Sequence, residues 1–198
     1  MQLVVNPTWS KTPNADVSLN TEFFDYTVPV RIPAMVDATL LAVGGVPGRR
    51  SYLRFELPAG IVDSATVTRA TLVLTQRPNP FSPDQDDSLT VYPTLVLAGA
   101  EITDPARAAT IVLRTGFFSD SIRVAPGDSG QVRLDVTTVV RSWRGLDPAI
   151  TPRAIVLLTP LEGATPREVL FHSANDANAQ LRPRLRISYV PRVGFGQP

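Results

Sequence analysis

The sequence predicts an all-β protein, a jelly-roll-like antiparallel β-sandwich with two short connecting helices. The clearest observation is residues 51–57, SYLRFEL, in which Leu53, Phe55 and Leu57 alternate with more polar side chains. A second alternating stretch, residues 70–75, follows a loop that is rich in turn residues. Alternation with a period of two is typical of half-buried strands. The 19 prolines and 12 glycines are spread along the chain and divide it into short strands, which is the pattern of a sandwich.

Length and composition favour one domain. The 198 residues suit a single all-β domain, expected at 14–190 between an N-terminal arm (1–13) and a C-terminal tail (191–198). A net charge of +1, from 19 basic and 18 acidic residues, lacks the basic excess of a nucleic-acid-binding protein. No apolar run is long enough to span a membrane. The absence of cysteine excludes thiol chemistry and disulfides.

The remaining elements follow from the same patterns. One short helix is expected to begin at Asp104-Pro105, an N-cap followed by a first-turn proline. A second is expected after Thr137, which can cap it, with Trp143 on its buried face and Gly145 at its end. Further strands are expected at 15–19, 28–32, 39–43, 89–97 (one strand, or two broken at Pro93), 131–136, 153–159, 168–172 and 184–190.

The two terminal segments are candidate contacts with a partner. Leu3, Val4 and Val5 form a short apolar stretch, which would pair with its own domain or add a strand to the edge of a neighbouring subunit. The tail contains Phe195 and shows no periodicity, so it is either frayed or a docking segment. These four residues are the predicted partner contacts.

Four pieces of the sequence resemble one family in order. SYLRFELP followed by VTRATLVL is similar to the signature of the DNRLRE-type domain, a secreted bacterial β-sandwich also classed among carbohydrate-binding modules. QVRLDVTTVVRSWRG, then AIVLL with VLFHSAN, and finally LRPRLRISYV resemble its later strands. The resemblance covers roughly residues 14–190, whereas residues 79–130 depart from the pattern. It implies export to the periplasm or cell surface, although residues 1–5 lack the features of a signal peptide.

No catalytic constellation is predicted. Gly127-Asp128-Ser129-Gly130 resembles the nucleophile stretch of trypsin-like proteases, but the one histidine, His172, follows the serine instead of preceding it. The motif is therefore interpreted as a turn. His172 is expected at the surface or partly buried. Glu56 and Glu168 each lie beside an arginine and are expected to form surface ion pairs, not a glycosidase pair.

A cofactor is not expected. Asp84, Asp86 and Asp87 lie in one proline-rich loop and could supply oxygen ligands to a structural calcium ion. Their spacing lacks the glycine and the distal glutamate of an EF-hand loop. A solvated acidic loop is the expected structure, with calcium kept as the alternative.

The function expected is that of a non-catalytic, exported structural or interaction module that docks on a larger protein assembly or cell surface. The alternative is a carbohydrate-binding module that recognises a polysaccharide. Sugars stack on exposed aromatic rings, and the candidates for this role are Trp9 and Tyr52, with Arg54 beside Tyr52 as a hydrogen-bond donor. Two tryptophans in 198 residues are a thin supply for a dedicated polysaccharide binder.

Overall fold

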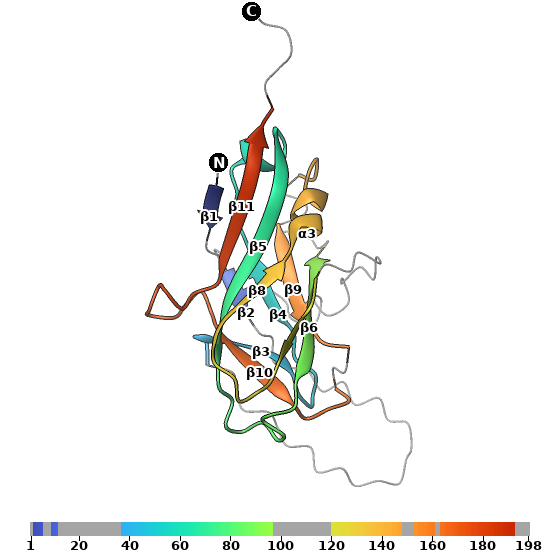
Figure 1. Ribbon diagram of the computed structural model, residues 1–198, viewed down its shortest axis with the longest axis vertical. Helices are drawn as coiled ribbons and strands as arrows, with labels where there is room; N and C mark the ends of the chain where they lie inside the picture. Colours follow the sequence, from blue (N-terminus) through green and yellow to red (C-terminus); the bar gives the residue numbers. More distant parts are fainter. Residues whose placement is uncertain are drawn as a thin grey trace, which may run out of the picture.

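Two antiparallel β-sheets pack face to face, as the sequence predicts (Figure 1). The computed structural model describes residues 2–5, 9–11, 37–96, 120–147, 153–160 and 163–192. Among these residues no helix is long and apolar enough to cross a membrane. The strands at 15–19 and 28–32, the helix at Asp104 and the tail from residue 193, all expected from the sequence, lie outside the described residues.

The first sheet, called sheet A, is organised around one long strand. This strand, β5 (Ala65–Arg77), pairs with β11 (Arg184–Pro191) along its first part and with β10 (Glu168–His172) near its end, and β8 (Gly130–Asp135) pairs with its other edge. A register shift between Ser188 and Tyr189 lets the long strand bend. The remaining strands of sheet A are β1 (Gln2–Val5) and β3 (Leu40–Gly44).

The second sheet, sheet B, has the order β2-β4-β9-β6-β7. Its strand β9 is buried on both faces, as its continuous apolar sequence predicts. Pro93 lies inside β6 without breaking it, because β7 pairs with Leu89–Val91 and has ended before Pro93 is reached. The bounds are β2 Trp9–Lys11, β4 Ser51–Arg54, β9 Ala154–Leu158, β6 Leu89–Val96 and β7 Ile122–Val124.

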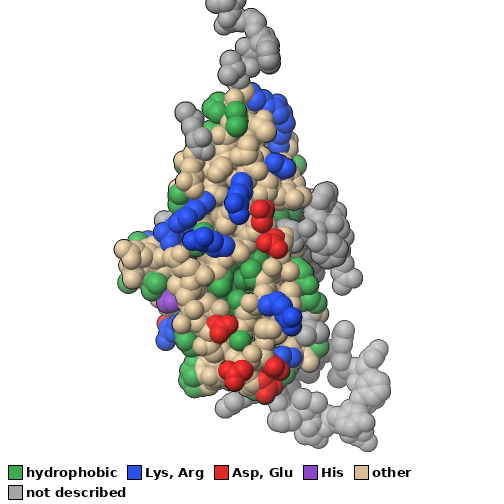
Figure 2. All heavy atoms as spheres, in the orientation of Figure 1, with side chains coloured by type: hydrophobic (Ala, Val, Ile, Leu, Met, Phe, Trp, Pro, Cys, Tyr) green, Lys and Arg blue, Asp and Glu red, His purple; other side chains and the backbone are tan. Residues whose placement is uncertain are grey.

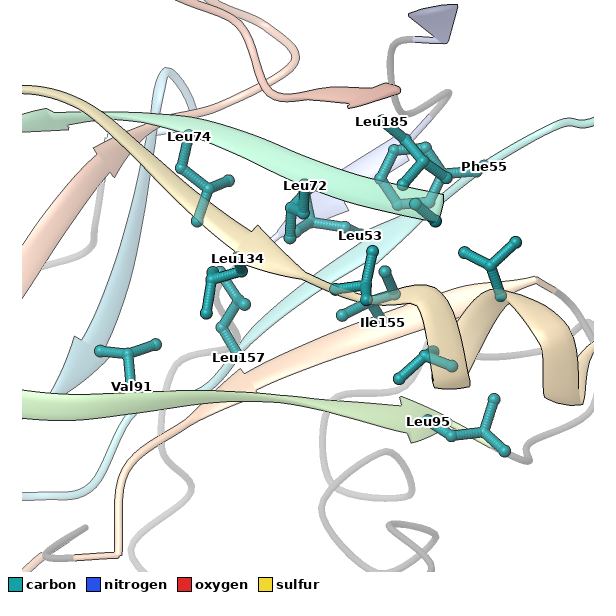
Figure 3. Close-up of a cluster of buried hydrophobic side chains, with 14 of the residues drawn as sticks. Leu53, Phe55, Leu72, Leu74, Val91, Leu95, Leu134, Ile155, Leu157 and Leu185 are labelled. Carbon is teal, nitrogen blue, oxygen red and sulfur yellow. The ribbon is translucent and has the colours of Figure 1, made fainter. Parts of the chain in front are cut away.

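The core lies between the inner faces of the two sheets (Figure 3). Every second residue of β5, β8 and β11 points into it from sheet A, and alternate residues of β4, β6 and β9 meet them from sheet B. Burial of these side chains is the main stabilising contribution to the fold. The largest inward-facing side chains include Leu53, Phe55, Leu72, Leu134, Ile155, Leu157 and Leu185.

The described residues contain two short helices, of which α3 was expected from the sequence and α1 was not. α3 (Thr137–Ser142) follows β8 and packs on β5, and Trp143 at its end is fully buried as predicted. Thr137 does not cap it, because its hydroxyl accepts a hydrogen bond from the Ala70 N–H at 2.8 Å. α1 (Ala59–Val62) lies in the segment interpreted as a loop; Ile61 and Val62 bury their side chains in the core.

The N-terminal segment belongs to the sandwich and is not a free arm. β1 pairs with β11 at the edge of sheet A, and β2 pairs with β4 in sheet B. Of the two alternatives, pairing within the same chain is therefore the one that occurs. Contacts of Leu3, Val4 and Val5 with a partner stay a prediction, because β11 pairs with one edge of β1 and β1 ends the strand order of sheet A.

Gly44 fills a backbone position that other residues fit poorly. Its φ of +94° lies in the left-handed region, and a Cβ there would stand 2.6 Å from the Arg167 carbonyl oxygen. We expect Gly44→Ala to lower the free energy of unfolding by about 2 kcal/mol. The matched control is Gly145→Ala, where φ is +74° in open space and the expected loss is about 1 kcal/mol. Urea unfolding of both variants measures the difference, and equal losses would contradict the steric part of this account.

Candidate functional site

Tyr52 does not form an exposed aromatic platform. Its side chain is only 1% exposed, although it lies on the outer face of sheet B, as predicted. The outer face is itself covered, since Val156 and Ala154, which β9 places beside Tyr52 and Arg54, are also buried. The prediction of a sugar-stacking role for Tyr52 is therefore wrong. Alternation in β4 identified the two faces correctly, but it could not show that both are buried.

The other predicted binding residues have mixed outcomes. Arg54 is half-buried and lies opposite Trp9 in the β2–β4 register; the structure describes the strand position of Trp9 but not its side chain. Leu3 is half-buried against the core, and Val4 is 50% exposed on the opposite face of β1. Phe195 lies outside the described residues.

Ser129 and His172 are kept apart by β5. Gly130 and Phe171 pair with Gln76 from opposite edges of this strand. Ser129 lies in an exposed turn, in which the Asp128 carboxylate accepts a hydrogen bond from the Ala125 N–H at 3.0 Å. His172 Nδ1 instead lies 2.6 Å from an Asp176 carboxylate oxygen. This hydrogen bond, with a second from the Asn178 N–H, holds the pKa of Asp176 below its usual range.

The acidic loop does not assemble a metal centre in the part of the chain that is described. Asp84, Asp86 and Asp87 are all exposed, and Asp87 pairs with Arg167 at 3.1 Å. No group of three or more histidine, cysteine or carboxylate side chains among the described residues is arranged to hold a metal ion. The loop also carries Phe81, whose side chain is 93% exposed.

Glu168 is not a surface residue. Its carboxylate pairs with Arg49 at 2.9 Å, and the two side chains are only 17% and 10% exposed. The Asn79 amide donates a further hydrogen bond to it at 3.3 Å. Burial raises the pKa of Glu168, although Arg49 and Asn79 oppose the shift. The predicted surface pairing with its neighbour Arg167 is therefore wrong. Glu168 pairs in the sheet with Gly44 at the end of β3, and its carboxylate binds Arg49 there.

The most distinctive surface among the described residues is the outer face of sheet A. Leu72, Leu134 and Leu185 share the core side, so the residues that alternate with them point outward. Five of these outward residues are arginines, and four of them lie along the part of β5 that pairs with β11 and β8. We call this surface the arginine face and define it by Arg69 on β5, Arg133 on β8, and Arg184 and Arg186 on β11.

The strand register determines how these arginines are spaced. Arg184 and Arg133 lie on either side of Val73, so their Cα atoms are about 10 Å apart, two strand spacings. Arg186 is the next outward residue on β11, about 7 Å further along. Val73 is only 1% exposed despite pointing outward. We attribute this burial to the aliphatic stems of Arg184, which is half-buried, and of Arg133, which is exposed.

The arginine face carries little compensating negative charge. Asp135 is the one acidic residue in the described strands β1, β5, β8 and β11. Its carboxylate is also engaged, because it accepts a hydrogen bond from the Thr137 N–H at 2.8 Å. Figure 2 shows basic side chains in the middle of this face, over β11 and β5, with acidic side chains directly beside them. These strands therefore hold more basic than acidic side chains, although the whole chain has a net charge of only +1.

Sequence reasoning did not detect this face. Arg133, Arg184 and Arg186 each occur in a strand that was predicted correctly, and each alternates with apolar residues. The missing information was the strand order, which brings β8 and β11 to opposite edges of β5. The sequence signal that could have revealed this face is the scarcity of acidic residues in these strands. The balanced charge of the whole chain concealed this local excess of arginine.

No family model matches the chain, and no curated protein matches it either. The similarity to the DNRLRE-type domain thus stays a prediction from four short stretches of sequence.

Proposed function

We propose that this protein is a non-catalytic interaction module that docks through its arginine face on an acidic surface of a larger protein assembly. The observation that carries the proposal is the group of four arginines, two exposed and two half-buried, with one engaged aspartate, on the outer face of sheet A. Arginine suits such a role, because its planar guanidinium group binds carboxylates in a bidentate manner and is weakly hydrated. A firm β-sheet presents these groups with little loss of backbone freedom on binding.

One further finding favours docking over the alternative of neutral polysaccharide recognition. Tyr52, one of the two expected platforms, is buried, which removes one aromatic ring on which sugars would stack. The outer face of sheet A offers positive charge in place of aromatic rings. The export of the module remains part of the proposal, supported by the DNRLRE-type resemblance, and cell fractionation with an antibody to the chain tests it.

The test begins with the native mass of the protein after gentle extraction from its own cells. We expect wild-type protein to migrate in a complex well above its own 21.4 kDa. We expect the Arg133→Gln/Arg184→Gln variant to bind the isolated partner at least about tenfold more weakly, since interface arginines are frequent hot spots. Raising the salt concentration should weaken wild-type binding.

The matched control is Arg123→Gln, which removes an exposed arginine from β7 in sheet B. It should leave binding unchanged. Free migration of the wild-type protein, or equal weakening by Arg123→Gln, would overturn the proposal. Binding to an acidic polysaccharide with no protein partner would also overturn it, in favour of the carbohydrate-binding alternative.

A further inference from the structure

A second group of arginines surrounds a cavity away from the arginine face. The cavity has a volume of about 200 Å³ and lies where β5 begins, near the ends of α3 and β11. These three ends come together at the top of the molecule in Figure 1. We call it the arginine pocket; its lining residues are Val62, Ala65, Thr66, Val67, Arg141, Arg144 and Arg192.

Backbone contacts hold the pocket in place. Arg141 donates a hydrogen bond from Nε to the Val67 carbonyl oxygen at 2.9 Å and another from Nη2 to the Thr68 carbonyl oxygen at 3.4 Å. Its guanidinium group is thereby fixed against the beginning of β5. Arg144 follows three residues later, with its N–H bonded to the Arg141 carbonyl oxygen at 3.2 Å. The N–H of Arg192 is bonded to the Ser64 carbonyl oxygen at 3.4 Å, which brings the end of β11 to the same site.

The pocket concentrates positive charge. Three of its seven lining residues are arginines, and none is acidic. The nearest acidic residue in sequence to this lining, Asp63, is already engaged, since its carboxylate lies 3.4 Å from Arg153 Nη2 and accepts a hydrogen bond from the Gly145 N–H at 3.2 Å. Among the described residues no carboxylate pairs with Arg144 or Arg192. Three neighbouring guanidinium groups repel one another, and an anion between them would relieve this repulsion.

Size and lining indicate the class of ligand. Typical small-molecule sites have volumes of about 300 Å³ or more, so a cavity of about 200 Å³ suits one small group. Guanidinium groups match the geometry of carboxylate and phosphate oxygens, and Val62, Ala65 and Val67 supply an apolar wall. We propose that the arginine pocket binds a single oxyanion, the carboxylate or phosphate group of a small organic anion with a short apolar part.

The experiment is an NMR titration of the full ¹⁵N-labelled chain with three probes: sodium propanoate, inorganic phosphate and the neutral isostere propanamide, with sodium chloride added to constant ionic strength. We expect saturable shifts of the Nε–H signals of the pocket arginines with propanoate or phosphate, and none with propanamide. The tighter of the two anions identifies the oxyanion class. We expect Arg144→Gln/Arg192→Gln to weaken binding at least tenfold, whereas Arg123→Gln leaves it unchanged.

Arg141 is left intact in this design because its side chain also supports the fold. The variant Arg144→Gln/Arg192→Gln must keep the urea midpoint of the wild type, because this separates loss of binding from loss of structure. If its midpoint falls, the single variant Arg192→Gln, at the exposed end of β11, supplies the same comparison. Shifts that do not saturate, equal shifts with propanamide, or equal weakening by Arg123→Gln would overturn the proposal. Because the pocket and the arginine face have separate variants, failure of one leaves the other standing.

Discussion

Replacing Trp143 with alanine is expected to lower the free energy of unfolding by about 4 kcal/mol. The side chain is fully buried, directly after α3, and belongs to the central core. Its ring lies against that of Phe55, the residue directly after β4, with ring centroids 6.5 Å apart and planes inclined at 39°. The substitution would leave a cavity and would detach α3 from the space between the sheets. Urea unfolding followed by circular dichroism measures the loss.

The control for this prediction is Trp143→Phe. The indole Nε1 is buried and has no hydrogen-bond partner among the described residues, so phenylalanine removes an unsatisfied donor while keeping an aromatic ring. We expect this variant to lose only about 1–2 kcal/mol, because the smaller ring leaves a smaller cavity. A loss below about 1 kcal/mol for Trp143→Ala would show that Trp143 does not anchor α3 in the core.

Replacing Arg49 with methionine is expected to lower the free energy of unfolding by about 3 kcal/mol at pH 7. The guanidinium group is the cationic partner of Glu168 at 2.9 Å, and both side chains are mostly buried. Methionine preserves much of the side-chain volume but leaves the carboxylate without its cation. An uncompensated buried charge costs more than the pair contributes.

The effect of Arg49→Met should depend on pH, and the sign follows from the pKa of Glu168. Burial raises this pKa in the folded protein, and Arg49 opposes the rise. A raised carboxyl pKa means that folding favours the protonated form, so its stabilising contribution is present at acidic pH and lost as pH rises through the folded pKa. Without Arg49 the pKa rises further. The variant's deficit relative to wild type should therefore be largest at pH 7 and smaller at pH 4.5, the ordinary pKa of this group.

The double variant Arg49→Met/Glu168→Gln separates charge from packing. Glutamine keeps a hydrogen-bond acceptor for Asn79, which donates to Glu168 at 3.3 Å, and removes the buried charge. We expect it to recover more than half of the loss and to show no pH-dependent deficit. Urea unfolding of the wild type and of both variants at pH 7 and pH 4.5 measures these differences in the free energy of unfolding. A single-variant deficit that is equal at both pH values would contradict the buried-charge explanation.

Local pattern was sufficient for most strands. The alternation in residues 131–136 and 184–190 and the continuous apolar run at 153–159 predicted β8, β11 and β9 within a few residues. Trp143 was assigned to the core from helical spacing and is fully buried. These features depend on neighbours in the chain, because the alternation of side chains along a strand is a property of the backbone itself.

Residues whose environment depends on distant segments were predicted less well. Tyr52 alternates like a surface residue, yet it is buried because both faces of sheet B are covered. Glu168 follows Arg167 in sequence, but its carboxylate pairs with Arg49. In both cases the deciding neighbours are more than one hundred residues away in the chain or belong to another strand, and no local pattern records them.

The sequence by itself determined the all-β class, the faces of the individual strands and the absence of thiol chemistry, because these follow from residue type and backbone period alone. Tertiary structure alone decided the arginine face and the arginine pocket. Arg133 and Arg184 become neighbours only when β8 and β11 pair with β5, and Arg192 joins Arg141 only when β11 ends beside α3. Charges act through space, so a chain with nearly balanced charge acquires positive surfaces only when strand order brings its arginines together.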